Sequence, residues 1–347
     1  MKRFKAAVLG ATGMVGVRFI ELLASHPWFK LEALAASERS AGQRFREAVR
    51  WLPQRELSSD ILEMEVKPVE PKALEDVDII FSALPAEVAR DVEVEFAKAG
   101  FAVFSNASAH RMDEDVPILN PEVNSEHASM VEEQKKRRGW DGFIVTNPNC
   151  TTAILTLSLK PIMDRFGIRR VLVSTMQALS GAGYPGVPSL DIVDNVIPYI
   201  KGEEEKVQRE TLKIMGEPFK PASFKVSASC HRVPTIDGHL ESVFVETEEE
   251  ADPVEVSRVM AEFTGEPQRL NLPTAPKPPI IVTFEENRPQ PRLDRMAGSG
   301  MAVVVGRIRK DEAIGGIKYL VLGHNTIRGA AGCSVLNAEL LAAKNII

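Results

Sequence analysis

Short apolar runs rich in β-branched residues alternate with longer helix-like stretches through the first half of the chain. Runs of this kind predict buried strands, and their alternation with helices is typical of a parallel, doubly wound sheet. The predicted strands cover residues 5–9, 31–36, 77–84, 101–104 and 143–145. The first half is therefore expected to be an α/β domain.

Beyond Cys150 the pattern changes to longer β-rich runs with few helices between them, which predicts a mixed sheet. The domain boundary is expected near Pro148, and the helical segment 327–344 is expected to return to the first domain. We therefore expect one domain from 1–148 together with 325–347, and a second from 149–324. The predicted strands of the second domain cover residues 171–176, 224–228, 242–246, 280–284, 302–308 and 319–322.

Composition narrows the class of protein. The chain has 347 residues, 44% of them hydrophobic, which is enough for two domain cores. A formal net charge of −6 gives no general attraction to nucleic acid or to anionic membranes. No signal peptide pattern opens the chain, and the uncharged stretches 142–159 and 171–190 are too interrupted by Pro, Gly and polar residues to span a membrane. We expect a cytoplasmic protein that acts on small molecules.

Cysteine usage argues against a metal site. The three cysteines, Cys150, Cys230 and Cys333, are too few and too scattered for a disulfide framework or a zinc site with paired spacing. No metal is therefore expected.

A glycine-rich turn follows the first predicted strand. Gly10, Gly13 and Gly16 lie between that strand and a helix pattern, where glycines allow a tight turn and a close approach of the backbone to a pyrophosphate. The context predicts a dinucleotide-binding site.

A polar turn about 20 residues further on bears on the choice of dinucleotide. At this place an acidic residue typically binds the ribose 2′-hydroxyl of NAD, and an arginine accepts the 2′-phosphate of NADP. Arg39 with Ser37 and Ser40 favours NADP, whereas Glu38 could select NAD.

Cys150 lies in the motif Asn147-Pro148-Asn149-Cys150-Thr151-Thr152, between a strand-like run and a helix-like run. At a helix N-terminus, free backbone N–H groups and the helix dipole favour the thiolate over the thiol. The motif predicts a nucleophile, although lone cysteines in such positions are also common as small core residues.

Three further polar residues could complete a catalytic centre. Arg232 and His239 share one short cluster, in which the arginine could bind a carboxylate and the imidazole could act as general acid and base. Gln177 ends an apolar strand before a glycine turn, where it could face either a substrate or water.

The ordered combination of these motifs resembles the aspartate-semialdehyde dehydrogenase family over essentially the whole chain. The resemblance implies an N-terminal Rossmann domain and a C-terminal mixed α+β catalytic and dimerisation domain of the glyceraldehyde-3-phosphate dehydrogenase type, in a homodimer or homotetramer. The residues that carry it are Gly10-Ala11-Thr12-Gly13, Asn149-Cys150-Thr151-Thr152, Gln177, Arg232, His239 and Asn325-Thr326-Ile327-Arg328-Gly329-Ala330-Ala331.

The resemblance also implies a mechanism. In the oxidative direction the Cys150 thiolate attacks aspartate 4-semialdehyde while His239 manages the proton, and hydride leaves to NADP. Inorganic phosphate then converts the thioester to aspartyl 4-phosphate, whereas biosynthetic flux towards lysine, threonine and methionine runs in reverse. Gln177 would orient the thioester, and Asn149 would fix the loop that carries the nucleophile.

Substrate contacts are implied in the same way. Arg232 would hold the substrate carboxylate, Glu203 its ammonium group, and Lys206 and Arg111 the phosphate. Spacing i, i+3 places Glu203 and Lys206 on one helix face. Two other interpretations stay open: the charged run 201–206 is also typical of a solvated helix face, and Arg111 could be a structural loop residue.

Neighbouring polar residues are expected to have structural roles. Glu204 and Glu205 are expected at the surface, and Cys230 and Cys333 in packing. His239 is preferred to His231 as the base because the family places its base seven residues after the arginine. The residues expected to contact NADP are Gly10, Thr12, Gly13, Met14, Val15, Ser37, Arg39, Ser40, Ser82, Ser180, Gly181 and Asn325.

Three other functions remain possible. A malonyl-CoA reductase would share the thioester chemistry, and such chains look similar over 180–186 and 287–290; the motif 147–152 and the Glu203/Lys206 pair favour an acyl phosphate instead. An N-acetyl-glutamyl-phosphate reductase usually has a Gly-Cys-Tyr context, which is absent here. A non-catalytic dinucleotide sensor would not need Cys150, Gln177, Arg232 and His239 together.

Overall fold

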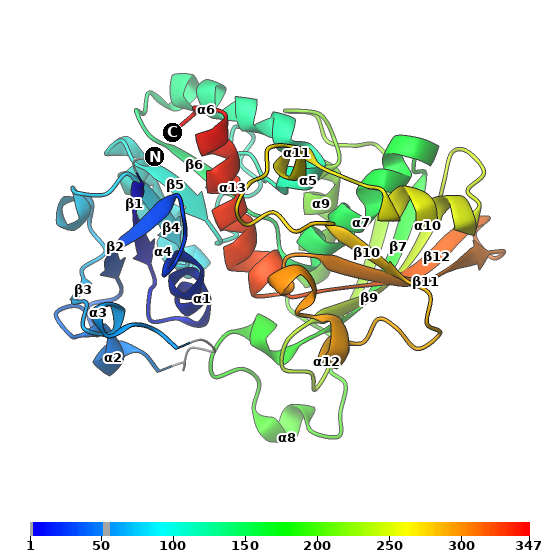
Figure 1. Cartoon of the computed structure of the whole chain (residues 1–347), viewed down its shortest axis with the longest axis horizontal. Coiled ribbons are helices and arrows are strands. Elements are labelled where there is room, and N and C mark those ends of the chain that lie inside the picture. Colours follow the sequence, from blue (N-terminus) through cyan, green and yellow to red (C-terminus); the bar gives the residue numbers. More distant parts are fainter. Residues whose placement is uncertain (1–2, 51–55) are drawn as a thin grey trace. The chain divides into compact units, whose positions relative to one another are not determined.

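The computed structural model describes residues 3–50 and 56–347, which form two compact units (Figure 1). The first unit comprises the chain up to Leu119, then Glu126–Asn147 and Ala330–Ile347. The second comprises Asn120–Ser125 and Pro148–Gly329.

The first unit contains a six-stranded parallel sheet in the order β3-β2-β1-β4-β5-β6. The predicted parallel sheet is confirmed, together with all five predicted strands. β3 was not predicted, because two residues carry no hydrophobic period. The strands are β1 Phe4–Leu9, β2 Phe29–Ala35, β3 Val66–Lys67, β4 Ile79–Ser82, β5 Ala102–Ser105 and β6 Phe143–Thr146.

Helices bury both faces of this sheet. Phe19 of α1 and Val335 of α13 share one core with Phe81 of β4, and Phe96 of α4 packs with Ile144 in the other. Strands covered on both sides are expected to be mostly apolar, as β4 and β6 are up to their last residue. Of the C-terminal segment, Ala330–Ile347 belongs to this unit, whereas residues 325–329 belong to the second unit. The helices of this unit are α1 Met14–Leu23, α2 Phe45–Ala48, α3 Ser59–Leu62, α4 Ala86–Lys98, α6 Met130–Arg138 and α13 Gly332–Ala343, with a 3₁₀ turn at Pro71–Leu74 and another at Ser125–Ser129.

The second unit contains a mixed six-stranded sheet in the order β10-β11-β12-β9-β7-β8, which confirms the second predicted sheet. β8 runs parallel to β7, and β9 runs antiparallel to it. The strands are β7 Arg170–Gln177, β8 Lys225–Arg232, β9 His239–Glu246, β10 Ile280–Thr283, β11 Val303–Asp311 and β12 Gly316–Gly323.

One face of the mixed sheet is buried, and the described residues leave the other face partly exposed. β9 alternates strictly between buried and half-buried residues, and the buried side includes Val243 and Val245. The opposite side of β7 and β9 leaves Leu172, Leu240 and Phe244 partly exposed. The helices of this unit are α5 Pro121–Asn124, α7 Cys150–Phe166, α8 Ser189–Ile192, α9 Glu203–Ile214, α10 Pro253–Ala261, α11 Glu266–Arg269 and α12 Pro291–Asp294, with turns at Leu179–Ala182, Ala297–Gly300 and Ile327–Ala331.

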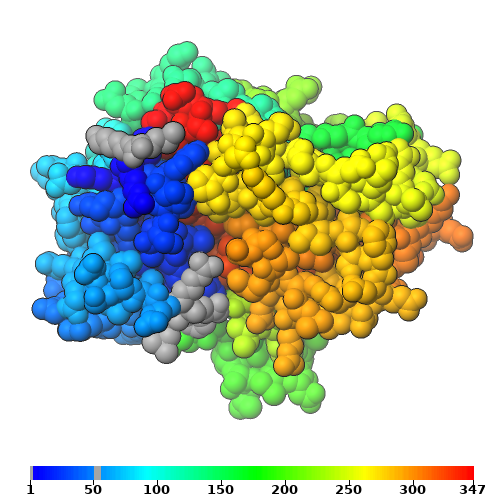
Figure 2. Space-filling view, in the orientation of Figure 1, coloured from blue at the N-terminus to red at the C-terminus, as the bar shows by residue number. Residues whose placement is uncertain are grey.

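A long loop with little regular structure joins β7 to α9. It contains α8 and forms the green protrusion of the second unit in Figures 1 and 2. Leu190 and Tyr199 are largely exposed on it, whereas Ile197 pairs with Arg232 at the edge of β8. Within the described ranges, no helix is both long and apolar enough to cross a membrane.

Candidate active site

Cys150 is the first residue of α7, so it lies at a helix N-terminus as the sequence predicted. The side chain of Asn149 caps this helix, because its Oδ1 accepts hydrogen bonds from the backbone N–H groups of Thr151 at 2.9 Å and Thr152 at 3.3 Å. Cys150 therefore lies at the positive end of the dipole of a 17-residue helix. This environment favours a thiolate.

Two acidic residues of α9 hold Asn149 in turn. Its backbone N–H donates to Glu210 Oε2 at 2.6 Å, and its Nδ2 donates to Glu203 Oε1 at 2.9 Å. Both carboxylates are buried. Sequence reasoning missed Glu210, which lies in the middle of a charged helix and has no local motif.

His239, the first residue of β9, faces the sulfur. Its Nε2 lies 3.2 Å from Cys150 Sγ, and its Nδ1 accepts the backbone N–H of Ala178 at 3.0 Å. A backbone N–H can only donate, so the neutral imidazole carries its proton on Nε2. Burial, helped by the charges of Arg232 and His324, lowers the pKa of His239 well below its usual value. His239 is therefore a neutral imidazole that directs an N–H group at Cys150.

Arg232 ends β8 close to the same residues. Its Nη1 donates to Ala178 O at 2.7 Å, and the side chain is buried. Burial lowers the pKa of Arg232, while the charges of Cys150 and Glu203 act against that shift. The turn at Gly181 packs directly on this group, because a Cβ there would lie 2.7 Å from Arg232 Nη1 and 3.2 Å from His239 Cε1.

Gln177 ends β7 beside Arg232 in the parallel register. Its side chain is buried, and its Nε2 donates to Thr175 Oγ1 at 3.3 Å. The alternative of an amide that faces water is thereby excluded.

Some charged residues of α9 lie near Cys150, and others lie at the surface. Lys206 Nζ lies 3.9 Å from Glu203 Oε2 on the predicted common face, and the lysine is partly exposed. The expectation that Glu204 lies at the surface was wrong: it is half-buried and accepts the backbone N–H of Cys230 at 3.0 Å, because α9 packs along β8.

The other two cysteines are buried, as expected of packing residues. Burial raises the pKa of Cys230 to about 12, so its thiol stays protonated at neutral pH. Cys333 lies within α13 in the first unit. Among the described residues, no group of three or more His, Cys, Asp or Glu is arranged to hold a metal ion.

The glycine-rich turn lines a cavity of about 520 Å³ in the first unit. Gly10 has φ 73°, and a Cβ there would lie 2.7 Å from Ala83 O. A Cβ on Gly16 would lie 2.2 Å from Gly10 O, so both positions require glycine. The cavity is lined by Gly10, Thr12, Gly13, Ala36, Ser37, Glu38, Pro68, Val69, Glu70, Ala83, Leu84, Pro85 and Val88.

The remaining residues expected at the cofactor are distributed over both units. Ser82 is buried at the end of β4, Arg39 is exposed and Ser40 is buried next to it. In the second unit, Asn325 Nδ2 donates to Ser180 Oγ at 2.7 Å. Met14 and Val15 open α1, and Gly181 lies against Arg232 as described above.

Arg111 lies in the first unit on the loop after β5. It is buried, and its Nη2 donates to Asn106 O at 2.9 Å. Arg111 therefore helps to hold the conformation of this loop.

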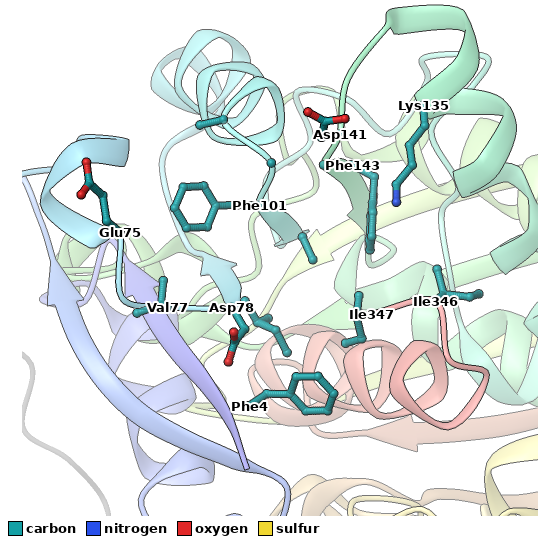
Figure 3. A pocket seen from close by; sticks show the side chains of 15 residues that line it. Phe4, Glu75, Val77, Asp78, Phe101, Lys135, Asp141, Phe143, Ile346 and Ile347 are labelled. Atoms are coloured by element: carbon teal, nitrogen blue, oxygen red, sulfur yellow. The ribbon is translucent and has the colours of Figure 1, made fainter. Parts of the chain in front are cut away.

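A second cavity of the first unit lies at the amino ends of the strands of the parallel sheet (Figure 3). Phe101 and Phe143 contribute apolar walls, and Glu75, Asp78 and Asp141 contribute carboxylates. Three carboxylates would repel a pyrophosphate, and ligands of such sheets bind at the carboxyl ends of the strands. The glycine-lined cavity is thus the better nucleotide site.

Comparison with known proteins agrees with this geometry. Residues 5–131 match the family model "Semialdehyde dehydrogenase, NAD binding domain", and residues 159–328 match "Semialdehyde dehydrogenase, dimerisation domain". An aspartate-semialdehyde dehydrogenase of Archaeoglobus fulgidus is 60% identical over 99% of this chain and 100% of its own length.

Two further relatives bear on function. A malonyl CoA reductase (NADP) of Metallosphaera sedula is 46% identical, over 100% of this chain and 99% of that protein. The crystal structure of aspartate semialdehyde dehydrogenase with NADP from Candida albicans superposes with a TM-score of 0.91 at 42% identity, covering 100% of both chains. Family models and full-length relatives agree, and the chain belongs to the aspartate-semialdehyde dehydrogenase family.

Proposed function

We propose that this protein catalyses the NADPH-dependent reductive dephosphorylation of 4-phospho-L-aspartate to L-aspartate 4-semialdehyde, on the pathway to lysine, threonine and methionine. The observation that carries the proposal is the 3.2 Å approach of His239 Nε2 to a cysteine at a helix N-terminus, with Arg232 beside both. The name of the 60% identical relative supports the same reaction.

Opposite charges beside the nucleophile suit an α-amino acid. The buried guanidinium of Arg232 can hold the α-carboxylate in a bidentate pair, and the buried carboxylate of Glu203 can hold the ammonium group. Lys206, which is partly exposed near Glu203, would hold the phosphate together with Arg111.

The reaction begins when the Cys150 thiolate attacks the acyl carbon, forming a C–S bond while the C–O bond to phosphate breaks. The cofactor, when bound, supplies hydride to the thioester carbon. His239 Nε2–H would donate a hydrogen bond to the oxygen that gains charge, and this oxyanion then re-forms the carbonyl as the C–S bond breaks, which releases the aldehyde and the Cys150 thiolate. Gln177 would orient the thioester carbonyl, and Asn149 keeps the sulfur at the helix N-terminus.

The residues of the first unit fit NADP. Gly10 and Gly13 bring bare backbone to the cavity, as a pyrophosphate requires, and α1 begins directly behind this turn. Arg39, with Ser37 and Ser40, would bind the 2′-phosphate. We therefore assign the first unit to cofactor binding and the second to catalysis and dimerisation.

A second candidate is the reduction of malonyl-CoA, favoured by the name of the 46% identical Metallosphaera sedula relative. That substrate carries no ammonium group, so it offers Glu203 no group to bind. The acyl phosphate uses both charges beside Cys150, and we prefer it for that reason.

The test is the absorbance of reduced nicotinamide. We expect phosphate-dependent reduction of NADP with aspartate semialdehyde, lost in Cys150→Ala while NADP still binds. Oxidation of NADPH with malonyl-CoA alone would assign the chain to the second candidate. No turnover with either substrate, but retained NADP binding, would identify a sensor.

We also propose that the protein is a cytoplasmic homodimer or homotetramer. The dimerisation-domain match covers the mixed sheet, whose uncovered face carries Leu172, Leu240 and Phe244. A second copy would bury this face. None of the three cysteines, all of which the structure describes, forms a disulfide, as suits a reducing compartment.

A further inference from the structure

A buried ion pair is connected to the helix that carries Cys150. Arg328 is fully buried, and it donates to Glu122 Oε1 at 2.8 Å and to Oε2 at 2.7 Å. It also donates to Asn120 Oδ1 at 2.6 Å. All three residues belong to the second unit.

Asn120 continues this contact into the nucleophile's helix. Its Nδ2 donates to Ala153 O and to Thr156 Oγ1, both at 2.9 Å. Because Ala153 lies one turn after Cys150, the side chain of Arg328 is connected to the first turn of α7 through a single amide.

The residue after Arg328 touches the nucleophile itself. A Cβ on Gly329 would lie 2.7 Å from the Cβ of Cys150 and 2.8 Å from its Cα. The backbone N–H of Gly329 donates to His324 O at 3.0 Å, which closes the turn. Only a residue without a side chain fits between this turn and Cys150.

We propose that Arg328 and Gly329 are positioning residues for Cys150: the ion pair with Glu122 fixes the turn, and the bare glycine backbone sets how far the thiol can lie from His239. The inference rests on the proposed role of Cys150 as the nucleophile. A buried Arg–carboxylate pair is often no more stable than apolar residues of the same volume. Its two parallel hydrogen bonds do define position, which is what a nucleophile needs.

The first test is Gly329→Ala, with Gly306→Ala as its matched control. Both glycines lie in the second unit and are crowded by neighbours, since a Cβ on Gly306 would lie 2.5 Å from Arg288 O. The readouts are kcat, KM and the rate at which iodoacetamide alkylates Cys150, located by peptide mass spectrometry. For Gly329→Ala we expect kcat and alkylation to fall, kcat on the order of 10²-fold, with KM for NADP unchanged. Gly306→Ala should change neither rate.

A second pair of variants keeps the test valid if Gly329→Ala fails to fold. Glu122→Gln removes one charge of the cluster at constant shape, and Glu339→Gln does the same to a buried carboxylate that contacts His26 at 2.7 Å in the first unit. We expect the rate of Cys150 alkylation, measured at alkaline pH where the thiol is fully ionised, to fall only in Glu122→Gln. Arg328→Lys should lower kcat, because an ammonium group cannot bind both carboxylate oxygens in a fixed plane.

Unchanged alkylation in both Gly329→Ala and Glu122→Gln would overturn the proposal, as would equal effects in the two control variants. Failure of the proposed function looks different. If the wild type does not act on aspartate semialdehyde but Cys150 alkylation still depends on Gly329 and Glu122, the positioning role stands and the substrate assignment falls.

Discussion

The backbone N–H of Ala178 donates to Nδ1 of His239 over 3.0 Å, and this one contact decides which atom of the histidine faces the nucleophile. A second proton on the ring would have to displace that bond. Because burial also lowers the pKa of His239, the imidazole stays neutral while its Nε2–H points at Cys150.

His239→Gln should lower kcat by about 10²–10³-fold, since the N–H donor positioned beside the reacting carbonyl oxygen is lost. The depressed pKa means that the wild-type imidazole stays neutral as the pH falls from 8 to 6. The acid limb of the kcat/KM profile should therefore not follow an ordinary histidine. A limb near pH 6.5 that disappears in His239→Gln would contradict this assignment.

Removing the cap of α7 should affect both stability and chemistry. Asn149→Ala loses the acceptor for two backbone N–H groups, which costs about 0.5–2 kcal/mol of unfolding free energy. It also releases Glu203 and exposes Cys150 to a frayed helix start, so we expect slower turnover and slower alkylation.

The matched control is Asp252→Ala, which removes the cap of α10 in the same unit. Asp252 Oδ1 accepts the N–H groups of Val254 at 2.9 Å and Glu255 at 3.3 Å, much as Asn149 does in α7. Chemical denaturation should show a similar loss of stability for both variants. Only Asn149→Ala should lose activity; an equal loss of activity would make the Asn149 effect one of stability alone.

Cofactor preference should depend on Arg39. Arg39→Ala removes a cation that would pair with the 2′-phosphate, and such charge-assisted contacts contribute about 1.5–3 kcal/mol. We expect KM for NADP to rise by roughly 10- to 10²-fold while KM for NAD changes little. Arg44→Ala, which instead removes the partner of Glu63, serves as the control. Equal effects on both cofactors would place Arg39 away from the 2′ position.

Much of the fold could be predicted because both sheets carry strong local patterns. The buried parallel strands form continuous apolar runs, and the strands of the mixed sheet alternate, so each type has its own signal. The two-residue strand β3 has no such signal and was missed. Its pairing with β2 is set by tertiary contacts alone.

The site was predictable where chemistry is concentrated in short motifs, as at Cys150 and Arg232. The residues that hold these catalytic side chains in place could not be predicted, because each lies far in sequence from the residue that it contacts. Glu210 lies 61 residues from Asn149, and Arg328 lies 206 residues from Glu122. No pattern within a window of the chain reports such a pair. Glu204 was misplaced for the same reason, since its burial depends on how α9 packs on β8.

Glu241 should make the protein's stability fall with rising pH. It lies two residues after His239 on the buried face of β9, and within the described part of the chain neither of its carboxylate oxygens has a hydrogen-bond partner. Burial raises its pKa well above the usual value of 4.5.

The direction of the effect follows from proton binding. Between the ordinary and the raised pKa of Glu241, the folded state holds a proton that the unfolded state has released, so raising the pH favours unfolding. Glu241→Gln cannot ionise and lacks this slope, which amounts to about 1.4 kcal/mol per pH unit in that window. Urea denaturation at pH 5 and pH 8 should therefore show that the unfolding free energy of Glu241→Gln rises relative to that of the wild type as the pH rises. If the unfolding free energy of the variant relative to the wild type stays constant or falls between pH 5 and pH 8, Glu241 is ionised in the folded protein, with a partner that supports its charge.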